Sequence, residues 1–305
     1  NTYSITMTEI VTLTILCLLD IWRLGHINVI RWLTHKVTRR ASARSLLTAV
    51  LEGNFGVTMN KVFFGDCRDT MRDLIAQGVK VQMCVTSPPY YWQRDYGHEG
   101  QLGLEDTPAD YVRAMVEVFG LVRELLADDG VLWLNIGDSY YSGNGQPTGS
   151  DPRSPSRDWM RKVLRPLDAP GLGWPKKSLL GIPWMVAHAL QADGWTLRSD
   201  VIWCRESAFA EPSVKDRPHR QHEYLFLLSK SRRYHFDRDA LPEESVWHIP
   251  HRRGVKGHSA AFPHELAKRC IESGSRPGDT VLDCFFGSGT TGEVAGNFGR
   301  QWIGC

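Results

Sequence analysis

Val281-Leu282-Asp283-Cys284-Phe285-Phe286-Gly287-Ser288-Gly289-Thr290-Thr291 is the stretch that decides the fold of this chain. Its apolar start predicts a buried strand, and the strand runs into a glycine-rich turn. Gly287 and Gly289 allow the backbone to approach a ligand closely, and open α/β sheets bind ligands at such turns. The hydroxyl side chains of the turn can contact a ligand or cap the next helix; they belong to Ser288, Thr290 and Thr291. The sequence therefore predicts a ligand-binding turn near its end.

This turn departs from the two best known phosphate-binding turns. It lacks the Gly-Lys-Ser/Thr ending of a P-loop, and its glycines do not follow the Gly-x-Gly-x-x-Gly spacing of dinucleotide-binding folds. Nucleoside triphosphates and nicotinamide cofactors are therefore disfavoured. On its own, a Gly-Ser-Gly turn is more often an ordinary loop than a cofactor site, so a second motif has to support it.

Thr86-Ser87-Pro88-Pro89-Tyr90-Tyr91 is that second motif, and it follows the strand predicted at residues 79–85. An exocyclic amino nitrogen of cytosine or adenine is a poor nucleophile, because its lone pair is delocalised into the ring. Acceptors set against its two hydrogens, here the Ser87 hydroxyl and the Pro88 carbonyl, would direct that lone pair at an incoming methyl group. Pro88 and Pro89 fix φ and so hold this carbonyl in place.

The same motif offers aromatic side chains. Tyr90, with Tyr91 or Trp92, could provide a face on which a base rotated out of a duplex stacks. The competing interpretation is a rigid turn without function. The buried strand before the motif and the aromatic residues around it favour the functional interpretation.

The rest of the chain alternates in the α/β manner from Met59 onward. Strands are predicted at residues 61–64, 79–85, 131–136, 195–204, 223–229, from 281, and at 301–305. Helices are predicted at residues 70–77, 110–126, 182–191, 263–273 and 290–298. The pair 195–204 and 223–229 is expected to form the antiparallel edge of a mixed sheet. Residues 142–178 and 231–257 are rich in polar, basic and turn residues, and we expect them to be irregular insertions.

Composition sets loose bounds on function. With 305 residues and 42% apolar content, the chain can bury one substantial core and carry an insertion. Its net charge of +2 comes from 36 basic and 34 acidic residues, which neither demands nor excludes a polyanionic partner. Seven scattered cysteines without a Cys-x-x-Cys pair argue against a disulfide framework and a zinc site, and they fit a reducing cytoplasm. The histidines at 248, 251, 258 and 264 lack the cysteines or carboxylates of a metal site.

The first 58 residues differ from the rest. Their apolar run, residues 10–19, is ten residues long, whereas a membrane span needs about 20. We expect the functional protein to start at or near Met59, after a non-core leader that is non-native or fused. A cleaved signal peptide is the alternative, although its basic start and its small-residue cleavage site are poorly matched.

The two motifs together resemble the amino-methylating DNA methyltransferases of bacteria and phages, which move a methyl group from S-adenosylmethionine to N4 of cytosine or N6 of adenine. The Ser-Pro-Pro-Tyr segment precedes the Phe-x-Gly-x-Gly segment, which is the circularly permuted order called the β class. The resemblance covers residues 59–305, including Gly65-Asp66, Arg94-Asp95-Tyr96-Gly97, residues 246–250 and Phe262-Pro263. It implies an α/β fold with a Rossmann-like, mixed but mostly parallel sheet of the class I methyltransferase type, circularly permuted, with irregular basic insertions.

The resemblance also implies roles for individual residues. The catalytic and base-binding residues would be Ser87, Pro88, Pro89 and Tyr90. Asp66 would lie near the adenine of S-adenosylmethionine. The other predicted cofactor-binding residues are Thr86, Asp283, Phe285, Phe286, Gly287, Ser288, Gly289, Thr290 and Thr291.

Two positions depart from the family pattern. Cys284 stands where the family usually has proline, a change that should leave the turn intact. After the strand at 301–305 the family normally places an acidic residue that holds the ribose hydroxyls, whereas this sequence stops at Cys305. We therefore expect a catalytic domain that is truncated at its C-terminus.

The target base is open between two amino groups. Within the resemblance, serine at the head of the catalytic motif is more typical of N4-cytosine enzymes, and N6-adenine is the alternative. A C5-cytosine enzyme would need a nucleophilic cysteine, usually in a Pro-Cys setting, and this sequence has no such dipeptide. A catalytically inactive DNA-binding relative and an enzyme acting on RNA also remain open.

Contact with double-stranded DNA is expected from the basic insertions 142–178 and 231–257. The predicted DNA-binding residues are Arg94, Arg153, Arg157, Lys176, Lys177, Arg252, Arg253 and Lys256. The alternative for each is a solvated surface charge. The resemblance adds a cognate restriction endonuclease as a partner and a cytoplasmic location, with no membrane and no metal.

Overall fold

The computed structural model describes residues 59–146, 164–205, 215–242, 244–250 and 263–305. The chain divides into two compact units, Asn1–Val57 and Thr58–Cys305, and all described residues belong to the second. The predicted leader, residues 1–58, therefore lies outside the described part.

The second unit is built on one mixed sheet, whose strand order in the described residues is β1-β8-β7-β2-β3-β5-β4-β6. Its strands are β1 Lys61–Val62, β2 Val81–Thr86, β3 Leu126–Ile136, β4 Thr196–Cys204, β5 His222–Ser229, β6 Val246–His248, β7 Thr280–Asp283 and β8 Gln301–Gly304. The five strands from β1 to β3 in this order pair in parallel. β5 is antiparallel to both β3 and β4, so the predicted mixed, mostly parallel sheet is confirmed.

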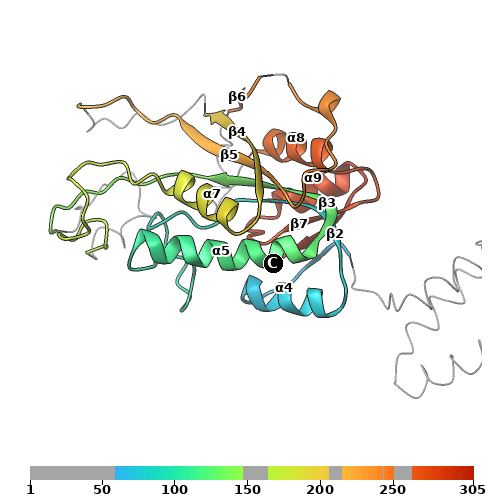
Figure 1. Ribbon diagram of the computed structural model, residues 1–305, viewed down its shortest axis with the longest axis horizontal. Coiled ribbons are helices and arrows are strands. Elements are labelled where there is room, and N and C mark those ends of the chain that lie inside the picture. The colour runs from blue at the N-terminus through green and yellow to red at the C-terminus, as the bar shows by residue number, and fades with distance from the viewer. Residues whose placement is uncertain (1–58, 147–163, 206–214, 243, 251–262) are drawn as a thin grey trace, which may run out of the picture. The chain divides into compact units, whose positions relative to one another are not determined.

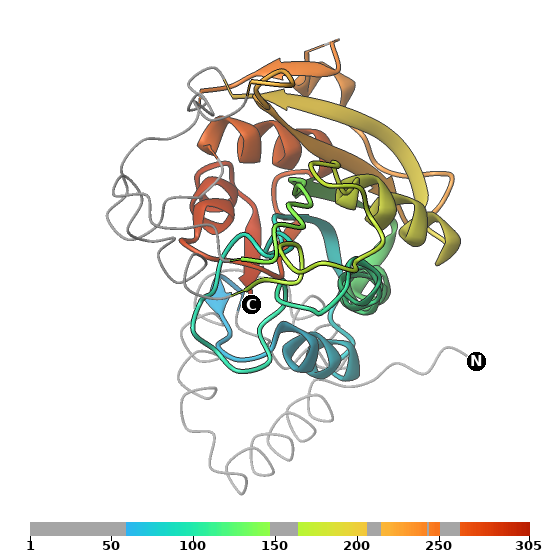
Figure 2. The same cartoon turned by 90° about the vertical axis from the view of Figure 1, so that its left-hand side faces the viewer.

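Helices cover both faces of this sheet. They are α4 Cys67–Ala76, α5 Pro108–Leu125, α7 Ile182–Ala192, α8 His264–Gly274 and α9 Thr290–Asn297. α4, α5 and α7 contact one another in series along one face, and α8 and α9 pack together on the other (Figures 1 and 2). Parallel strands need such crossover helices, and these bury the sheet on both sides.

α5 shows how local sequence sets an element. The Thr107 hydroxyl accepts a hydrogen bond from the Asp110 N–H at 3.1 Å, and Pro108 occupies the first turn, so the helix starts two residues before the predicted position. Its buried residues recur at helical spacing and include Met115, Phe119 and Val122. That apolar stripe packs the helix on the sheet.

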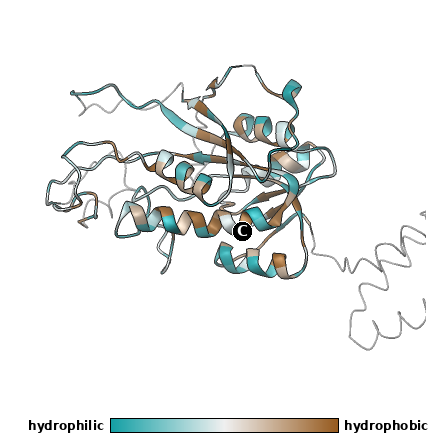
Figure 3. Ribbon diagram, viewed as in Figure 1, coloured by the Kyte–Doolittle hydropathy of each residue, from teal (hydrophilic) through white to brown (hydrophobic). Residues whose placement is uncertain are grey.

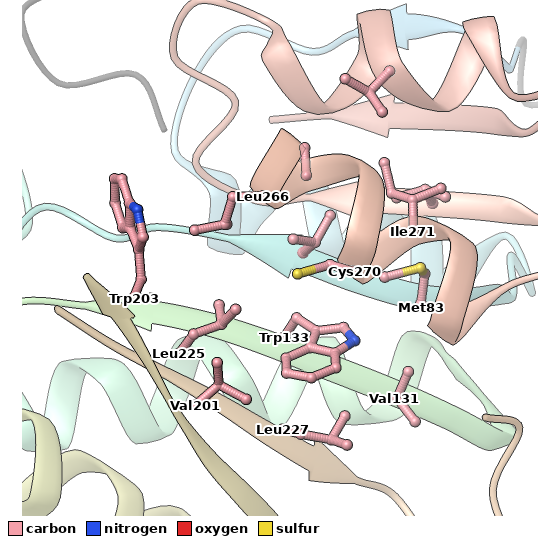
Figure 4. Close-up of a cluster of buried hydrophobic side chains, with 14 of the residues drawn as sticks. Met83, Val131, Trp133, Val201, Trp203, Leu225, Leu227, Leu266, Cys270 and Ile271 are labelled. Carbon is pink, nitrogen blue, oxygen red and sulfur yellow. The ribbon is translucent and has the colours of Figure 1, made fainter. Parts of the chain in front are cut away.

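The face under α8 and α9 holds a large hydrophobic cluster. Met83, Val131 and Trp133 from the central strands face Cys270 and Ile271 of α8 (Figure 4). Residues two apart on a strand point to the same face, so Val131 and Trp133 enter this cluster together. Hydrophobic residues colour much of the central strands, while the helices alternate between hydrophobic and hydrophilic residues along their length (Figure 3).

Two predicted elements were wrong in extent. The strand predicted at residues 131–136 begins five residues earlier, because β3 starts at Leu126 and includes the polar residues 128–130. The pairing of β2 with β3 jumps from Val81↔Leu126 to Met83↔Val131, so the polar residues are accommodated in an irregularity rather than in a loop.

The second correction concerns the sheet edge. Residues 231–257 were expected to be irregular, yet β6 lies within them and pairs in parallel with β4, with Trp203 opposite Trp247. Both indoles are buried, and the Trp203 Nε1–H donates to the Ile249 carbonyl at 2.9 Å. β6 is therefore the edge outside the β4–β5 pair. Three residues are too short a run for strand periodicity to reveal.

The insertion at 142–178 is described from residue 164 onward and at its start. Residues 164–178 contain turns and no helix or strand. Asp168 is buried and fastens this segment, since it accepts from the Ser142 hydroxyl at 2.6 Å and from the Arg165 Nε at 2.6 Å. Among the helices that the structure describes, none has the length and apolar character needed to cross a membrane.

Candidate active site

The two sequence motifs meet at the centre of the sheet. β2 ends at Thr86 and its parallel neighbour β7 ends at Asp283. The Thr86 hydroxyl donates to Asp283 Oδ1 at 2.6 Å, which joins residues 197 positions apart in the sequence. From β7 the chain moves through α9 to β8 on one side, while β2 and β3 lie on the other side. The motifs therefore occupy the topological switch point, where open α/β sheets bind ligands.

The buried Asp283 carboxylate accepts hydrogen bonds from both ends of the glycine-rich turn. Its Oδ2 accepts from the Thr291 hydroxyl at 2.6 Å, and its Oδ1 also accepts from the Phe285 N–H at 3.1 Å. Burial raises the pKa of this carboxyl, and the hydrogen bonds from Thr291, Thr86 and Phe285 act against that shift. Thr86, Asp283 and Thr291 thus brace the turn; their predicted contact with a cofactor stays a prediction.

The turn itself has the backbone conformation that glycine permits. Gly287 and Gly289 have φ of 52° and 83°, and Gly289 caps the start of α9. Gly287 and Ser288 are exposed, and the Ser288 hydroxyl lies 3.4 Å from that of Thr290. The upper rim of the turn therefore presents backbone and hydroxyl groups to a ligand.

Phe286 packs into the fold rather than standing free on the rim. Its ring stacks on Trp302 of β8 with centroids 5.1 Å apart. A Cβ added at Gly304 would come within 2.4 Å of this ring. Phe285 is half-buried beside it. Of the two phenylalanines, Phe286 is therefore the one whose ring packs against β8.

Asp66 lies at the carboxyl ends of the parallel strands, as the two motifs do. It follows β1 and caps α4, where its Oδ1 accepts from the Arg68 N–H at 2.8 Å. The Arg68 Nη2 lies 2.6 Å from its Oδ2, and the hydrogen bond from Arg68 lowers the pKa of the Asp66 carboxyl. Because β1, β8, β7 and β2 pair in parallel, Asp66, the glycine-rich turn and Ser87 all follow the carboxyl ends of their strands on the same side of the sheet.

Two backbone carbonyls of the Ser-Pro-Pro-Tyr turn accept hydrogen bonds that hold the turn in place. The Tyr111 hydroxyl donates to the Pro89 carbonyl at 2.9 Å, and the Gln93 N–H donates to the Tyr90 carbonyl at 3.0 Å. Pro88 is buried, and Ser87 is half-buried at the strand end. The structure thus brings Ser87, Pro88, Pro89 and Tyr90 together in a rigid loop.

The aromatic residues after Pro89 differ in what they can do. Tyr91 is buried and packs against Tyr111 with ring centroids 5.7 Å apart, so its ring is not available to a base. Trp92 is half-buried, and its Nε1–H donates to the Glu105 carbonyl at 2.7 Å. The Tyr90 ring lies against Gly137, where an added Cβ would come within 2.6 Å.

Sequence reasoning missed the polar residues behind Tyr90. The Tyr90 hydroxyl donates to Glu223 Oε2 at 2.6 Å, and Asn135 Oδ1 lies 3.1 Å from the same hydroxyl. Arg205 Nη1 donates to Glu223 Oε1 at 3.0 Å. One signal was available, because Asn135 is a polar residue inside the otherwise apolar run 131–136.

The predicted DNA-binding residues are only partly described. Arg94 is half-buried and follows the catalytic loop, and Lys176 is exposed. Lys177 is exposed and forms an ion pair with Asp216. Arg153, Arg157, Arg252, Arg253 and Lys256 lie outside the described residues. Within the described ranges, no cluster of three or more His, Cys, Asp or Glu residues could hold a metal ion.

Comparisons with known proteins agree with this geometry. The family model N6_N4_Mtase, DNA methylase, matches residues 81–305. Type II methyltransferase M.Cfr9I of Citrobacter freundii is 44% identical over 253 residues, which is 80% of this chain and 82% of that protein. Type II methyltransferase M.SmaI of Serratia marcescens is 43% identical over 256 residues, 80% of this chain and 85% of that protein.

Solved structures share the fold. The PvuII DNA methyltransferase, described as cytosine-N4-specific, superposes with a TM-score of 0.58 at 20% identity and covers 80% of both chains. The M1.HpyAVI complex with SAM gives a TM-score of 0.50 at 17% identity, over 80% of this chain and 91% of that one. At these identities the likeness concerns the fold alone.

Proposed function

The chain belongs to the N6/N4 family of DNA methylases, and we propose that it transfers a methyl group from S-adenosylmethionine to the exocyclic N4 amino group of a cytosine in double-stranded DNA. One observation carries the proposal. The 2.6 Å hydrogen bond from Thr86 to Asp283 holds the end of the Ser-Pro-Pro-Tyr strand beside the glycine-rich turn. A methyl donor bound at the glycine-rich turn and a base bound at the Ser-Pro-Pro-Tyr segment would then be neighbours, as direct methyl transfer requires.

The glycine-rich turn fits S-adenosylmethionine. Gly287 is exposed, its φ is left-handed, and a Cβ added there would meet only the Phe285 carbonyl at 3.8 Å, so a ligand can approach the backbone. We assign the rim, Phe285, Gly287, Ser288 and Gly289, to the methionine and ribose, and Asp66 to the adenine end. When bound, this group supplies a methyl carried on a sulfonium.

Ser87 and Pro88 prepare the nucleophile. The Ser87 oxygen and the Pro88 carbonyl accept the two amino hydrogens of the flipped base, which turns the nitrogen lone pair toward the methyl carbon. The nitrogen–carbon bond would form as the carbon–sulfur bond breaks with its electron pair left on sulfur, and the methylated nitrogen would then release one proton to water. The hydrogen bonds that the Pro89 and Tyr90 carbonyls accept hold the loop in the conformation that this step uses.

Cytosine is favoured over adenine by the first residue of the catalytic motif. Serine stands at this position, where the resemblance associates serine with N4-cytosine enzymes. N6-adenine is the alternative, since either amino group can donate to a hydroxyl and a carbonyl. Consistent with relatives named type II methyltransferases, we further propose a cognate restriction endonuclease as the companion activity and the cytoplasm as the location.

The test is a methyl-transfer reaction on mixed-sequence duplex DNA with isotope-labelled S-adenosylmethionine, followed by nucleoside analysis. The proposal expects labelled N4-methylcytosine, with single-stranded RNA of matched composition as the acceptor control. Labelled N6-methyladenine would support methyl transfer to an amino group but would refute cytosine as the target base. Folded protein that binds DNA without transferring label would point to an inactive DNA-binding relative.

A further inference from the structure

The Tyr90 hydroxyl stands at the centre of a hydrogen-bonded chain behind the catalytic serine. The Ser87 hydroxyl lies 3.2 Å from the Tyr90 oxygen and can donate to it, and Tyr90 lies 2.6 Å from Glu223 Oε2. These three residues come from the loop after β2 and from β5. The catalytic loop and the antiparallel strand are thereby joined through side chains.

The direction of this chain follows from a count of protons. A phenol has one hydrogen to donate, and Tyr90 has two acceptors in reach, Glu223 Oε2 at 2.6 Å and Asn135 Oδ1 at 3.1 Å. The shorter contact is to a carboxylate, and hydrogen bonds to charged acceptors are the stronger ones. Tyr90 therefore donates to Glu223, and its oxygen is left as an acceptor for the Ser87 hydrogen.

Both carboxylate oxygens of Glu223 accept hydrogen bonds from neighbouring side chains. Arg205 Nη1 donates to its Oε1 at 3.0 Å, and Asn135 Nδ2 donates to its Oε2 at 3.2 Å. Arg205 is itself fixed by a bond from its Nη2 to the Arg220 carbonyl at 3.3 Å. An ionised carboxylate has no hydrogen to donate, so this end of the chain can only accept.

We propose that Tyr90 and Glu223 are positioning residues that set the direction of the Ser87 hydroxyl. With its hydrogen turned to Tyr90, the Ser87 oxygen presents its lone pairs to the amino group of the target base. A freely rotating hydroxyl could instead donate to the amino nitrogen and engage the lone pair that must attack the methyl group. The inference rests on the proposed methyl transfer, and it holds for cytosine and adenine alike.

The test compares Tyr90→Phe and Glu223→Gln with the wild-type protein. Tyr90→Phe keeps the ring against Gly137 and removes the acceptor for Ser87. In Glu223→Gln, Arg205 selects the amide oxygen, so the amide N–H faces Tyr90 and the phenol loses its carboxylate acceptor; its hydrogen is then shared between Asn135 Oδ1 and the Ser87 oxygen. We expect the rate of methyl transfer at saturating substrates to fall about tenfold to a hundredfold in each variant, the effect of one charge-linked hydrogen bond.

Further measurements separate positioning from loss of structure. The KM for DNA, the cofactor affinity and the unfolding midpoint should stay near the wild-type values. The double variant should be no slower than the slower single variant, because both act through one hydroxyl. Tyr224→Phe is the matched control. Tyr224 follows Glu223 in the sequence, but its ring packs on Trp184 and Phe226. This variant should keep the full rate of methyl transfer.

The outcomes distinguish this inference from the function it rests on. Wild-type protein that transfers no methyl group would overturn both. Active wild-type protein with a full rate in Tyr90→Phe or in Glu223→Gln would overturn only the positioning role. Rate losses that multiply in the double variant, or that come with matching losses of cofactor affinity, would also overturn it and indicate a structural role.

Discussion

The most informative residue contacts lie at the ends of β2 and β7, where a buried carboxylate, two hydroxyls and two glycines fix the geometry of the site. Asp283 is buried and accepts from Thr86, Thr291 and Phe285, so the turn depends on a group that burial disfavours when charged. The sequence predicted these residues as members of one candidate site. It could not show which of them face a ligand and which face inward, because that depends on the pairing of β2 with β7.

Thr86→Val should destabilise the fold, because it removes a donor from the buried Asp283 carboxylate. We expect the free energy of unfolding to fall by about 1–3 kcal/mol near neutral pH. Thr280→Val is the control, because Thr280 is also a buried threonine and lies on β7, the strand that carries Asp283; its change should stay within about 1 kcal/mol. Denaturant unfolding measures both, and equal effects of the two substitutions would contradict the role given to Thr86.

The same variant has a predicted pH dependence. Burial raises the folded-state pKa of Asp283, so the stability that this group contributes is present below its unfolded pKa and is lost as pH rises through the folded pKa. Removing a donor raises that folded pKa further. The cost of Thr86→Val should therefore be larger at pH 7 than at pH 4, and a cost that shrinks toward pH 7 would exclude this explanation.

Gly287→Val tests the glycine-rich turn. A β-branched residue at φ of 52° is strained by about 1–3 kcal/mol, and its side chain would stand where we place the cofactor. Cofactor affinity, measured by calorimetry, should fall at least about tenfold. Gly78→Val is the control, because Gly78 also has positive φ and open space but lies past the end of α4. Equal affinity in both variants would remove Gly287 from the cofactor site.

At the scale of elements, hydrophobic periodicity predicted most helices and strands, and it failed where an element is short or irregular. α5 and α7 were predicted nearly in full, since both bury a continuous apolar stripe. β6 was missed because it has three residues, and β3 was cut short because its start is polar and irregularly paired. The partners Glu223 and Arg205 were missed because only the antiparallel placement of β5 brings them behind Tyr90.

Trp247→Ala should show that β6 belongs to the core. The Trp247 indole is buried against Trp133, with ring centroids 5.8 Å apart. We expect the free energy of unfolding to fall by about 3–5 kcal/mol, the usual cost of removing a large buried aromatic side chain. Val246 is 46% exposed, so Val246→Ala should change the free energy of unfolding by about 0.5 kcal/mol or less. A small effect of Trp247→Ala would mean that β6 is not a stable part of the sheet.

At the scale of the whole molecule, the circularly permuted order of the motifs gives the sheet order β1-β8-β7-β2-β3-β5-β4-β6, in which the last strands of the chain lie among the first. The order of the two motifs predicted a circularly permuted, mostly parallel sheet, but it did not predict the order of the strands within that sheet. Local patterns could not predict how the basic insertions meet DNA, because charge along a loop does not specify a surface. The net charge of +2 is too small to indicate which surface contacts DNA.

Lys176→Ala tests the assignment of the 142–178 insertion to DNA. Lys176 is exposed, and a lysine that contacts a phosphate releases about one counterion, so the slope of log affinity against log salt should fall by about 1. Lys80→Ala is the control, because Lys80 precedes β2 and so lies at the opposite edge of the sheet from Ser87. Identical slopes for Lys176→Ala and wild-type protein would place Lys176 outside the DNA contact.

The central claim is that Ser87, held beside the glycine-rich turn, activates an amino group for methyl transfer. It is tested most directly by the single-turnover rate of labelled methyl transfer to duplex DNA in Ser87→Ala and wild-type protein, with cofactor affinity measured alongside. The account predicts N4-methylcytosine from the wild type, and in Ser87→Ala a fall of about a hundredfold or more with cofactor affinity unchanged. A full rate in Ser87→Ala, or no transfer by folded wild-type protein, would contradict it.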